Sequence, residues 1–236
     1  MIPFIVFDPA NVVLHQLNAN GITQFGAFGA GEAALASRTL NLKVFLEGLF
    51  DPTTEIMRES MDGNLGEPKW GIGIADHITV ELHQADAPYN LLETFTGIAL
   101  HTIGTASLDV SPQYNGSYYL SIKNRNHMNI WSAVPVSFAG SVANYDFTTG
   151  ALQAFASPGG IEPQFQVALD KFAMYVGDLD QGSWVDATDF NIFEPDLTIG
   201  STGFFDADFD GGGWVDAVDF NLFEPRLTSG IYTQTP

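Results

Sequence analysis

The sequence predicts a mainly β protein, in which an antiparallel β-sandwich is followed by a small α-helical domain of two loop–helix units. Four segments upstream of residue 140 alternate apolar and polar side chains with the two-residue period of a strand. No long segment has the 3.6-residue period of an amphipathic helix, which would compete with this assignment. A 22-residue segment near the end of the sequence occurs twice, which predicts two packed copies of one small unit.

The alternating segments and the turn residues between them place the sandwich at residues 38–150. Dipeptides typical of turns, Asp62-Gly63, Ala87-Pro88 and Asn115-Gly116, separate the segments, as expected for an antiparallel arrangement. Residues 151–176 are then a connector to the repeated segment. The predicted strands are Leu40–Glu47, His77–His83, Ser117–Lys123 and Ile130–Val136.

The first 37 residues differ from the rest in composition. Ile2–Phe7 is apolar and β-prone, and Gly26–Ser37 is rich in Gly and Ala. Ile2–Phe7 is either the first strand of the sandwich or an arm that pairs with an open sheet edge of a neighbouring subunit, by β-strand addition. A third interpretation is that the segment is disordered. The arm would make the chain a homo-oligomer or a filament subunit.

The repeated segment has the residue spacing of a calcium-binding loop. Gly177–Thr198 recurs as Ala207–Thr228, with 15 of 22 positions identical. An EF-hand-type loop binds Ca²⁺ through oxygens at positions 1, 3, 5, 7, 9 and 12, with a backbone carbonyl at position 7. We therefore expect two calcium ions, one in each loop. The candidate ligands are Asp178, Asp180, Trp184 (through its carbonyl), Asp186 and Asp189 in the first loop, and Asp208, Asp210, Trp214 (carbonyl), Asp216 and Asp219 in the second.

Both loops lack a side-chain ligand at position 5, where Gly182 and Gly212 stand. Water or a backbone oxygen must take that place, so affinity should fall. Asp186 is also expected to cap the following helix. The Gly211–Gly213 run predicts that the second loop is the more flexible and binds calcium more weakly.

The alternative is that these aspartates form a solvated acidic surface. Residues 177–228 contain twelve carboxylates and a single basic residue, Arg226. Carboxylates this close together repel one another and shift toward protonation. Two calcium ions would cancel four of these charges where they are densest, so a cation-binding role is the better interpretation.

A short helix is expected after each loop, within a paired domain of residues 177–230 that is followed by a tail of residues 231–236. Pro195 and Pro225 disfavour helical geometry at the preceding Glu residues and should end the helices near Glu194 and Glu224. Each copy has one apolar stripe, through which the two helices should pack. The stripes are Phe190, Phe193 and Leu197, and Phe220, Phe223 and Leu227. Val185 and Val215, at position 8 of the loops, should also be buried.

The duplicated pattern D-x-[DN]-x-x-x-x-[VI]-D-x-x-D resembles the dockerin-type calcium module. In that family, polar residues at positions 10 and 11 recognise cohesins, whereas this chain has Ala187-Thr188 and Ala217-Val218. The order of several segments also resembles a secreted module of Bacteroidota, in which an immunoglobulin-like β-domain runs directly into a dockerin-like pair. This resemblance covers about residues 38–228 and implies architecture and an extracellular or cell-surface location rather than an activity. The segments are Leu40–Gly48, Asp76–Tyr89, Gly116–Phe138, Tyr145–Thr149 and Phe172–Asp180.

The composition agrees with an exported protein that does not bind nucleic acid. The formal net charge is −20 with 8 basic residues, whereas phosphate contacts need Lys and Arg. No apolar run is long enough to span a bilayer. Met1–Phe7 is too short for a signal-peptide core, so the numbering is interpreted as that of a mature chain. The chain has no cysteine, so calcium could stabilise it where disulfides do not.

The sequence shows few signs of catalysis, and we expect no enzyme activity. His77, Glu81 and His83 can share one face of a strand, but a zinc site would need a further ligand. The predicted function is that of a calcium-binding structural protein that assembles at the cell surface. The alternative is an adaptor that docks a cohesin-like or carbohydrate partner, through aromatic residues such as Trp70 and Tyr119. Trp131 is expected at the edge of the core, and Trp184 and Trp214 on the β-domain or on a partner.

Overall fold

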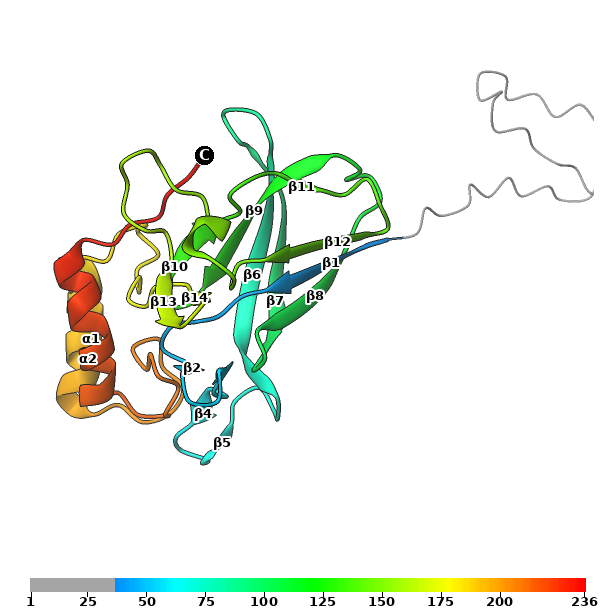
Figure 1. Ribbon diagram of the computed structural model, residues 1–236. Coiled ribbons are helices and arrows are strands. Elements are labelled where there is room, and N and C mark those ends of the chain that lie inside the picture. The colour runs from blue at the N-terminus through cyan, green and yellow to red at the C-terminus, as the bar shows by residue number, and fades with distance from the viewer. Residues whose placement is uncertain (1–36) are drawn as a thin grey trace, which may run out of the picture. The chain divides into compact units, whose positions relative to one another are not determined.

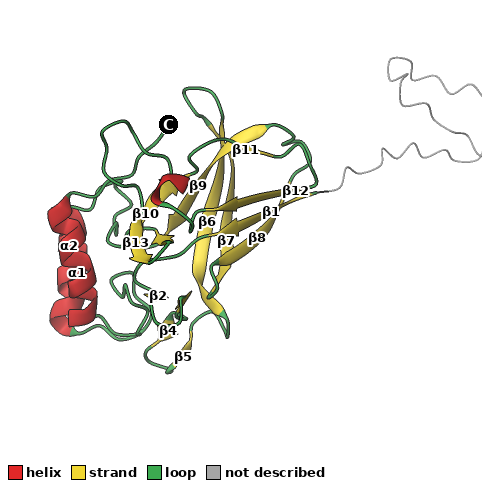
Figure 2. Cartoon of the chain, viewed as in Figure 1, coloured by secondary structure: helices red, strands yellow, loops and turns green. Residues whose placement is uncertain are grey.

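The computed structural model describes residues 37–236, which contain two helices and fourteen strands (Figure 1). The first 36 residues, including the proposed arm, lie outside the described residues. Figure 2 shows that strands dominate up to residue 173 and that both helices follow them. The strands are β1 (Arg38–Lys43), β2 (Phe50–Asp51), β3 (Ile56–Met57), β4 (Met61–Asp62), β5 (Glu67–Pro68), β6 (Ile74–Gln84), β7 (Leu91–His101), β8 (Thr105–Val110), β9 (Ser117–Asn124), β10 (His127–Trp131), β11 (Val136–Ser137), β12 (Val142–Asp146), β13 (Phe165–Ala168) and β14 (Lys171–Ala173), with a 3₁₀ turn at Ala151–Gln153 and helices α1 (Ala187–Ile199) and α2 (Ala217–Ser229).

Two sheets enclose the larger hydrophobic core. One has the strand order β12-β1-β8, and the other has the order β10-β9-β6-β7 with β11 paired to β9. Most pairs are antiparallel, but β1 and β12 run parallel. Leu40 and Leu42 of β1 belong to the same buried cluster as Val80 of β6 and Ile122 of β9. This arrangement is compatible with the predicted β-sandwich, and the mainly β character is confirmed.

Two of the predicted strands are shorter in the structure. The first ends at Lys43 rather than Glu47, because Phe45 and Glu47, expected on the solvent face, are both buried. Phe45 packs against Phe50, with ring centroids 4.8 Å apart, and Glu47 contacts α2. The fourth is interrupted between β10 and β11, where Val134 is exposed.

The helices extend past their prolines, so the predicted ends near Glu194 and Glu224 are wrong. Each helix has thirteen residues and is followed by a glycine in the left-handed conformation, Gly200 at φ 63° and Gly230 at φ 61°. Pro195 and Pro225 are exposed, so water can hydrate the carbonyl that each proline leaves without its helical donor. The extra turn brings Leu197 and Leu227 onto the core.

The predicted apolar stripes form a second hydrophobic cluster between the helices and the β-strands. Phe193 and Phe223 are fully buried, with ring centroids 5.2 Å apart. Val185 and Val215 are also buried, as predicted. Met128 of β10 belongs to this cluster, and residues 36–236 form one compact unit. Neither helix of the described residues is long and apolar enough to cross a membrane.

Candidate metal-binding loops

Each loop runs directly into a helix whose first turn it stabilises. The Asp186 side chain accepts a hydrogen bond from Thr188 N at 2.7 Å, and Asp189 accepts one from Asp186 N at 2.8 Å. Asp216 and Asp219 make the equivalent capping box at the start of α2. The predicted capping role of Asp186 is therefore confirmed.

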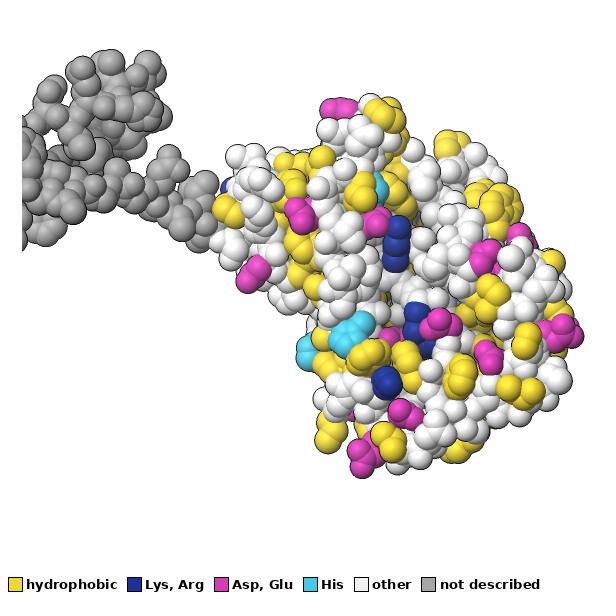
Figure 3. Space-filling view, turned by 180° about the vertical axis from the view of Figure 1, so that it is seen from behind, with side chains coloured by type: hydrophobic (Ala, Val, Ile, Leu, Met, Phe, Trp, Pro, Cys, Tyr) yellow, Lys and Arg dark blue, Asp and Glu magenta, His cyan; other side chains and the backbone are white. Residues whose placement is uncertain are grey.

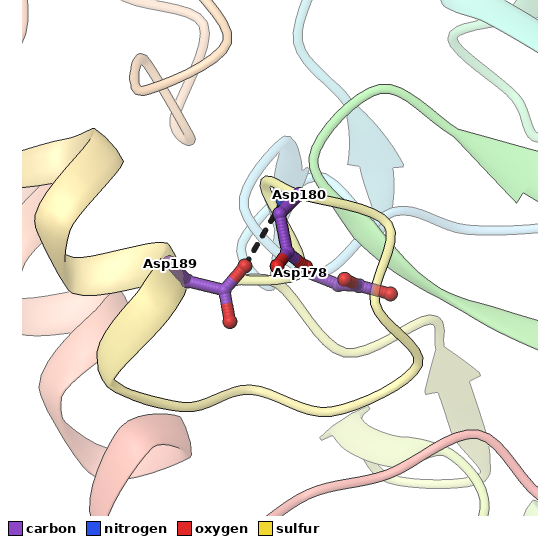
Figure 4. A group of neighbouring side chains, drawn as sticks. All are labelled: Asp178, Asp180 and Asp189. Carbon is purple, nitrogen blue, oxygen red and sulfur yellow. Dashed lines mark hydrogen bonds between the residues drawn. The ribbon is translucent and has the colours of Figure 1, made fainter.

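Three carboxylates converge within each loop. Asp178, Asp180 and Asp189 each offer an oxygen, and these oxygens lie within 4.8 Å of one another (Figure 4). Asp208, Asp210 and Asp219 form the same arrangement in the second loop. These are the two groups in residues 37–236 that could hold a metal ion, although exposed acidic groups are also common without one.

The structure places the other predicted ligands at the rim of each loop. Asp186 and Asp216 are exposed and lie outside the two triads. Trp184 and Trp214 are 53% and 51% exposed, respectively. Trp184 stacks on Tyr232, with ring centroids 4.7 Å apart, rather than on a β-strand. The bridge between these two residues uses Ser183 O and Val185 N, so it leaves the carbonyl oxygen of Trp184 free to bind a metal.

Burial raises the pKa of the aspartates that begin the two loops. The pKa of Asp178 rises to about 7 because the side chain is desolvated and the Asp189 carboxylate is near. The pKa of Asp208 also rises to about 7, again mainly through burial. Burial raises the pKa of Asp219 to about 6. A nearby cation would remove this cost and keep the carboxylates ionised.

The two loops differ in how they satisfy their first aspartate. Asp178 is fully buried, and neither carboxylate oxygen makes a well-formed hydrogen bond, although the amides of Gly182 and Ser183 lie near enough to oppose the rise of its pKa. Asp208 is equally buried, but its oxygens accept hydrogen bonds from Gly212 N at 3.0 Å and Gly213 N at 2.8 Å. The Asp178 carboxylate is therefore the less well satisfied of the two, and a metal ion would satisfy it.

The second loop packs closely against the β-domain. Met61 N donates a hydrogen bond to Gly211 O at 2.9 Å. A Cβ on Gly213 would lie 2.6 Å from the backbone of Gly63, and a Cβ on Gly63 would lie 1.9 Å from Gly213 O. The glycine run predicted a flexible second loop, but Gly211 and Gly213 are buried, so their small size serves close packing.

Two arginines of the β-domain contact the second loop. Arg58 Nη1 lies 3.2 Å from Asp210 Oδ2. Arg125 donates to Asp208 O at 3.2 Å and pairs with Asp76 at 3.0 Å. Within residues 37–236, no ion pair involves a carboxylate of the first loop. On the face shown in Figure 3, most of the few basic side chains lie near acidic ones, while other acidic side chains have no basic neighbour.

Sequence reasoning could not find Arg58 and Arg125. Their positions in the sequence lie 152 and 83 residues from the loop residues that they contact, and neither belongs to a recognisable motif. The one feature of the sequence that could have indicated these contacts is the small number of basic residues. With 8 of them in the chain, each had a high chance of pairing with one of the 28 acidic residues.

The histidine and tryptophan candidates outside the loops contact other protein groups. His83 Nε2 lies 3.2 Å from Glu81, and Lys123 Nζ lies 2.8 Å from the same carboxylate. Among the described residues, neither His83 nor Glu81 belongs to a group that could hold a metal ion. Trp70 donates to Asp76 at 3.1 Å, and Trp131 packs against His83.

A search of protein-family models and a search of curated proteins found no match to this chain.

Proposed function

We propose that this chain is an extracellular calcium-binding structural protein without enzyme activity, in which two calcium ions stabilise the loop–helix pair. The buried carboxylate of Asp178, which no basic side chain of the described residues neutralises, is the observation that carries this proposal. It lies within a triad of oxygen donors on a twelve-residue loop, and the arrangement is repeated 30 residues later.

The donor set favours calcium over other metals. The groups that converge are carboxylates, and hard cations prefer such oxygens. Zinc prefers His and Cys ligands. The glycine at position 5 removes one ligand from each loop, which suits the modest affinities, about 10⁻⁴–10⁻³ M, of extracellular modules.

Thermal unfolding of the intact chain tests this proposal. We expect millimolar calcium to raise the melting temperature well above its value in EGTA, because the ions bind only the folded loops. Magnesium at the same concentration should give a smaller rise, because it demands stricter octahedral geometry. Equal melting temperatures in calcium and EGTA would contradict the proposal.

We further propose that the protein assembles with copies of itself at the cell surface. The apolar segment Ile2–Phe7 supports this proposal through its sequence, although it lies outside the described residues. Strands β8 and β12 end the three-stranded sheet, and an outermost strand can accept an added strand. Light scattering after size exclusion should show oligomers that disappear when residues 2–7 are deleted, while a wild-type monomer would contradict assembly.

The alternative function is that of an adaptor for a cohesin-like or carbohydrate partner. The half-exposed indoles of Trp184 and Trp214 favour it, because exposed tryptophans are common at binding hot spots. A polysaccharide binding screen, with a Trp184→Ala, Trp214→Ala double variant as control, tests whether the partner is a carbohydrate. Binding by the wild type that the variant loses would support the adaptor.

A further inference from the structure

The two loops differ in what holds them closed, and this difference has a structural consequence. We propose that the ion in the first loop, and not the ion in the second, controls whether the segment Ile231–Gln234 stays fixed to the β-domain. This inference rests on the proposed calcium binding and gives one of the two sites a regulatory role.

Among the described residues, the first loop has no basic side chain that could replace a cation. The amides of Gly182 and Ser183 approach the buried Asp178 carboxylate without forming a well-formed hydrogen bond, and Asp180 and Asp189 place further negative charge within 4.8 Å of it. No ion pair in the described part of the chain offsets these charges. Removing the ion therefore leaves close, desolvated carboxylates, which favours opening of the loop.

In the second loop, protein groups partly take the place of a cation. The amides of Gly212 and Gly213 donate to Asp208, and Arg58 pairs with Asp210. The hydrogen bond from Met61 N to Gly211 O and the backbone contact between Gly63 and Gly213 hold the loop against the β-domain. These contacts do not involve a metal, so the loop should stay closed after chelation.

The segment Ile231–Gln234 bridges the first loop and the rest of the molecule. On the loop side, Val185 N donates to Ile231 O and Thr233 N donates to Ser183 O, both at 2.9 Å. Tyr232 stacks on Trp184 between these two hydrogen bonds. Opening the first loop would remove all three contacts together.

The other side of the segment contacts the β-domain and the connector. Thr233 Oγ1 donates to Asn129 O at 3.1 Å, and Gln234 Nε2 donates to Ile161 O at 2.8 Å. Gln234 Oε1 also accepts from Ser157 N at 2.8 Å. Ile231 is buried in the same hydrophobic cluster as Val185 of the first loop, so both the apolar anchor of the segment and its backbone pairing depend on that loop.

The second loop pairs in the same way with residues 201–203, and contacts with the β-domain hold this pairing in place. Val215 N donates to Ser201 O at 2.8 Å, and Gly203 N donates to Gly213 O at 2.9 Å. Asn64 of the β-domain donates to Thr202 O at 3.2 Å. Gly213 itself is held against Gly63, so this pairing does not depend on the ion.

Hydrogen exchange of the intact chain, in calcium and in EGTA, tests the proposal. The amides of Val185 and Thr233 should exchange about tenfold faster or more in EGTA, because local opening frees them. The amides of Val215, Gly203 and Met61 should change little. Equal acceleration at Thr233 and Val215 would overturn the inference.

Two variants separate the roles of the loops. Asp208→Asn should leave the calcium response of Thr233 intact. Asp178→Asn removes a ligand and the buried charge together, so Thr233 should exchange at the same rate with and without calcium. Loss of the Thr233 response in Asp208→Asn would overturn the inference. Calorimetry separates the two claims: no calcium binding by the wild type overturns the proposed function and this inference, whereas binding with equal responses overturns this inference alone.

Discussion

The guanidinium of Arg226, on α2, forms a buried ion pair with the carboxylate of Glu47, which follows β1. Arg226 Nε lies 3.0 Å from Oε1 and 3.1 Å from Oε2, and Nη2 also donates to Oε1. Burial raises the pKa of Glu47, while Arg226 and the amide of Val176 oppose that shift. The first repeat has Asp196 at the equivalent position, so the second repeat alone has the residue that joins its helix to the β-domain.

Replacing Arg226 with Met should lower the free energy of unfolding by about 3 kcal/mol, because the Glu47 charge would stay buried without a partner. Urea denaturation in calcium measures this change. The double variant with Glu47→Gln should recover part of the loss, since it removes the unpaired charge. A loss below about 1 kcal/mol in the single variant would show that the ion pair contributes as little as an exposed one.

Substitutions at matched positions of the two loops should have opposite effects. Gly213→Ala places a Cβ 2.6 Å from the Gly63 backbone at φ 83°, and we expect a loss of about 2 kcal/mol or more. Ser183, its counterpart, has φ 71° without being glycine, so Ser183→Gly should stabilise the protein by up to about 1 kcal/mol. Thermal melts in calcium measure both changes. Equal effects of the two substitutions would contradict the packing difference between the loops.

The strand periodicity and the apolar stripes gave a good account of the local structure. Alternation identified β6 and β9 because one face of each is buried against the opposite sheet. Predictions from local sequence were wrong where tertiary contacts determined burial or helix length. Glu47 is polar but buried because Arg226 reaches it, and α1 continues past Pro195 because Leu197 gains a place in the core.

Asp178→Asn should change the stability in opposite directions with and without calcium. In EGTA the substitution removes a buried charge that desolvation and Asp189 disfavour and should stabilise the protein, whereas in calcium it removes a ligand and should destabilise it. Asp208→Asn should destabilise the protein in calcium and change its stability little in EGTA, because the loss of an acceptor for a glycine amide offsets the removal of the buried charge. Urea denaturation of both variants in each buffer tests this. Two variants with the same sign pattern would contradict the difference between Asp178 and Asp208.

Calcium affinity should fall as the pH falls from 7.5 to 5.5. The pKa of Asp178 is raised to about 7 by burial and by Asp189, so its carboxyl group takes up a proton across this window. Calcium binds the ionised carboxylate, so each proton that must leave lowers the apparent affinity by up to about tenfold per pH unit below the pKa. Titration calorimetry at both pH values measures the change. An affinity independent of pH would show that the carboxylates are ionised before calcium binds.

The sequence identified the aspartate triads but not their unequal environments. Position in the repeat was sufficient to predict Asp178, Asp180 and Asp189, because loop spacing is local. The neighbours of the second loop, such as Arg58 and Gly63, come from the β-domain and depend on the whole fold. Glycine content alone therefore could not show that the second loop packs against the β-domain.

Native mass spectrometry in calcium is the most direct test of metal binding by the two loops. We expect two calcium ions on the wild-type chain, one on each of the Asp178→Asn and Asp208→Asn variants, and none on the double variant. A wild-type chain without bound calcium, or a double variant that still retains two ions, would contradict the account.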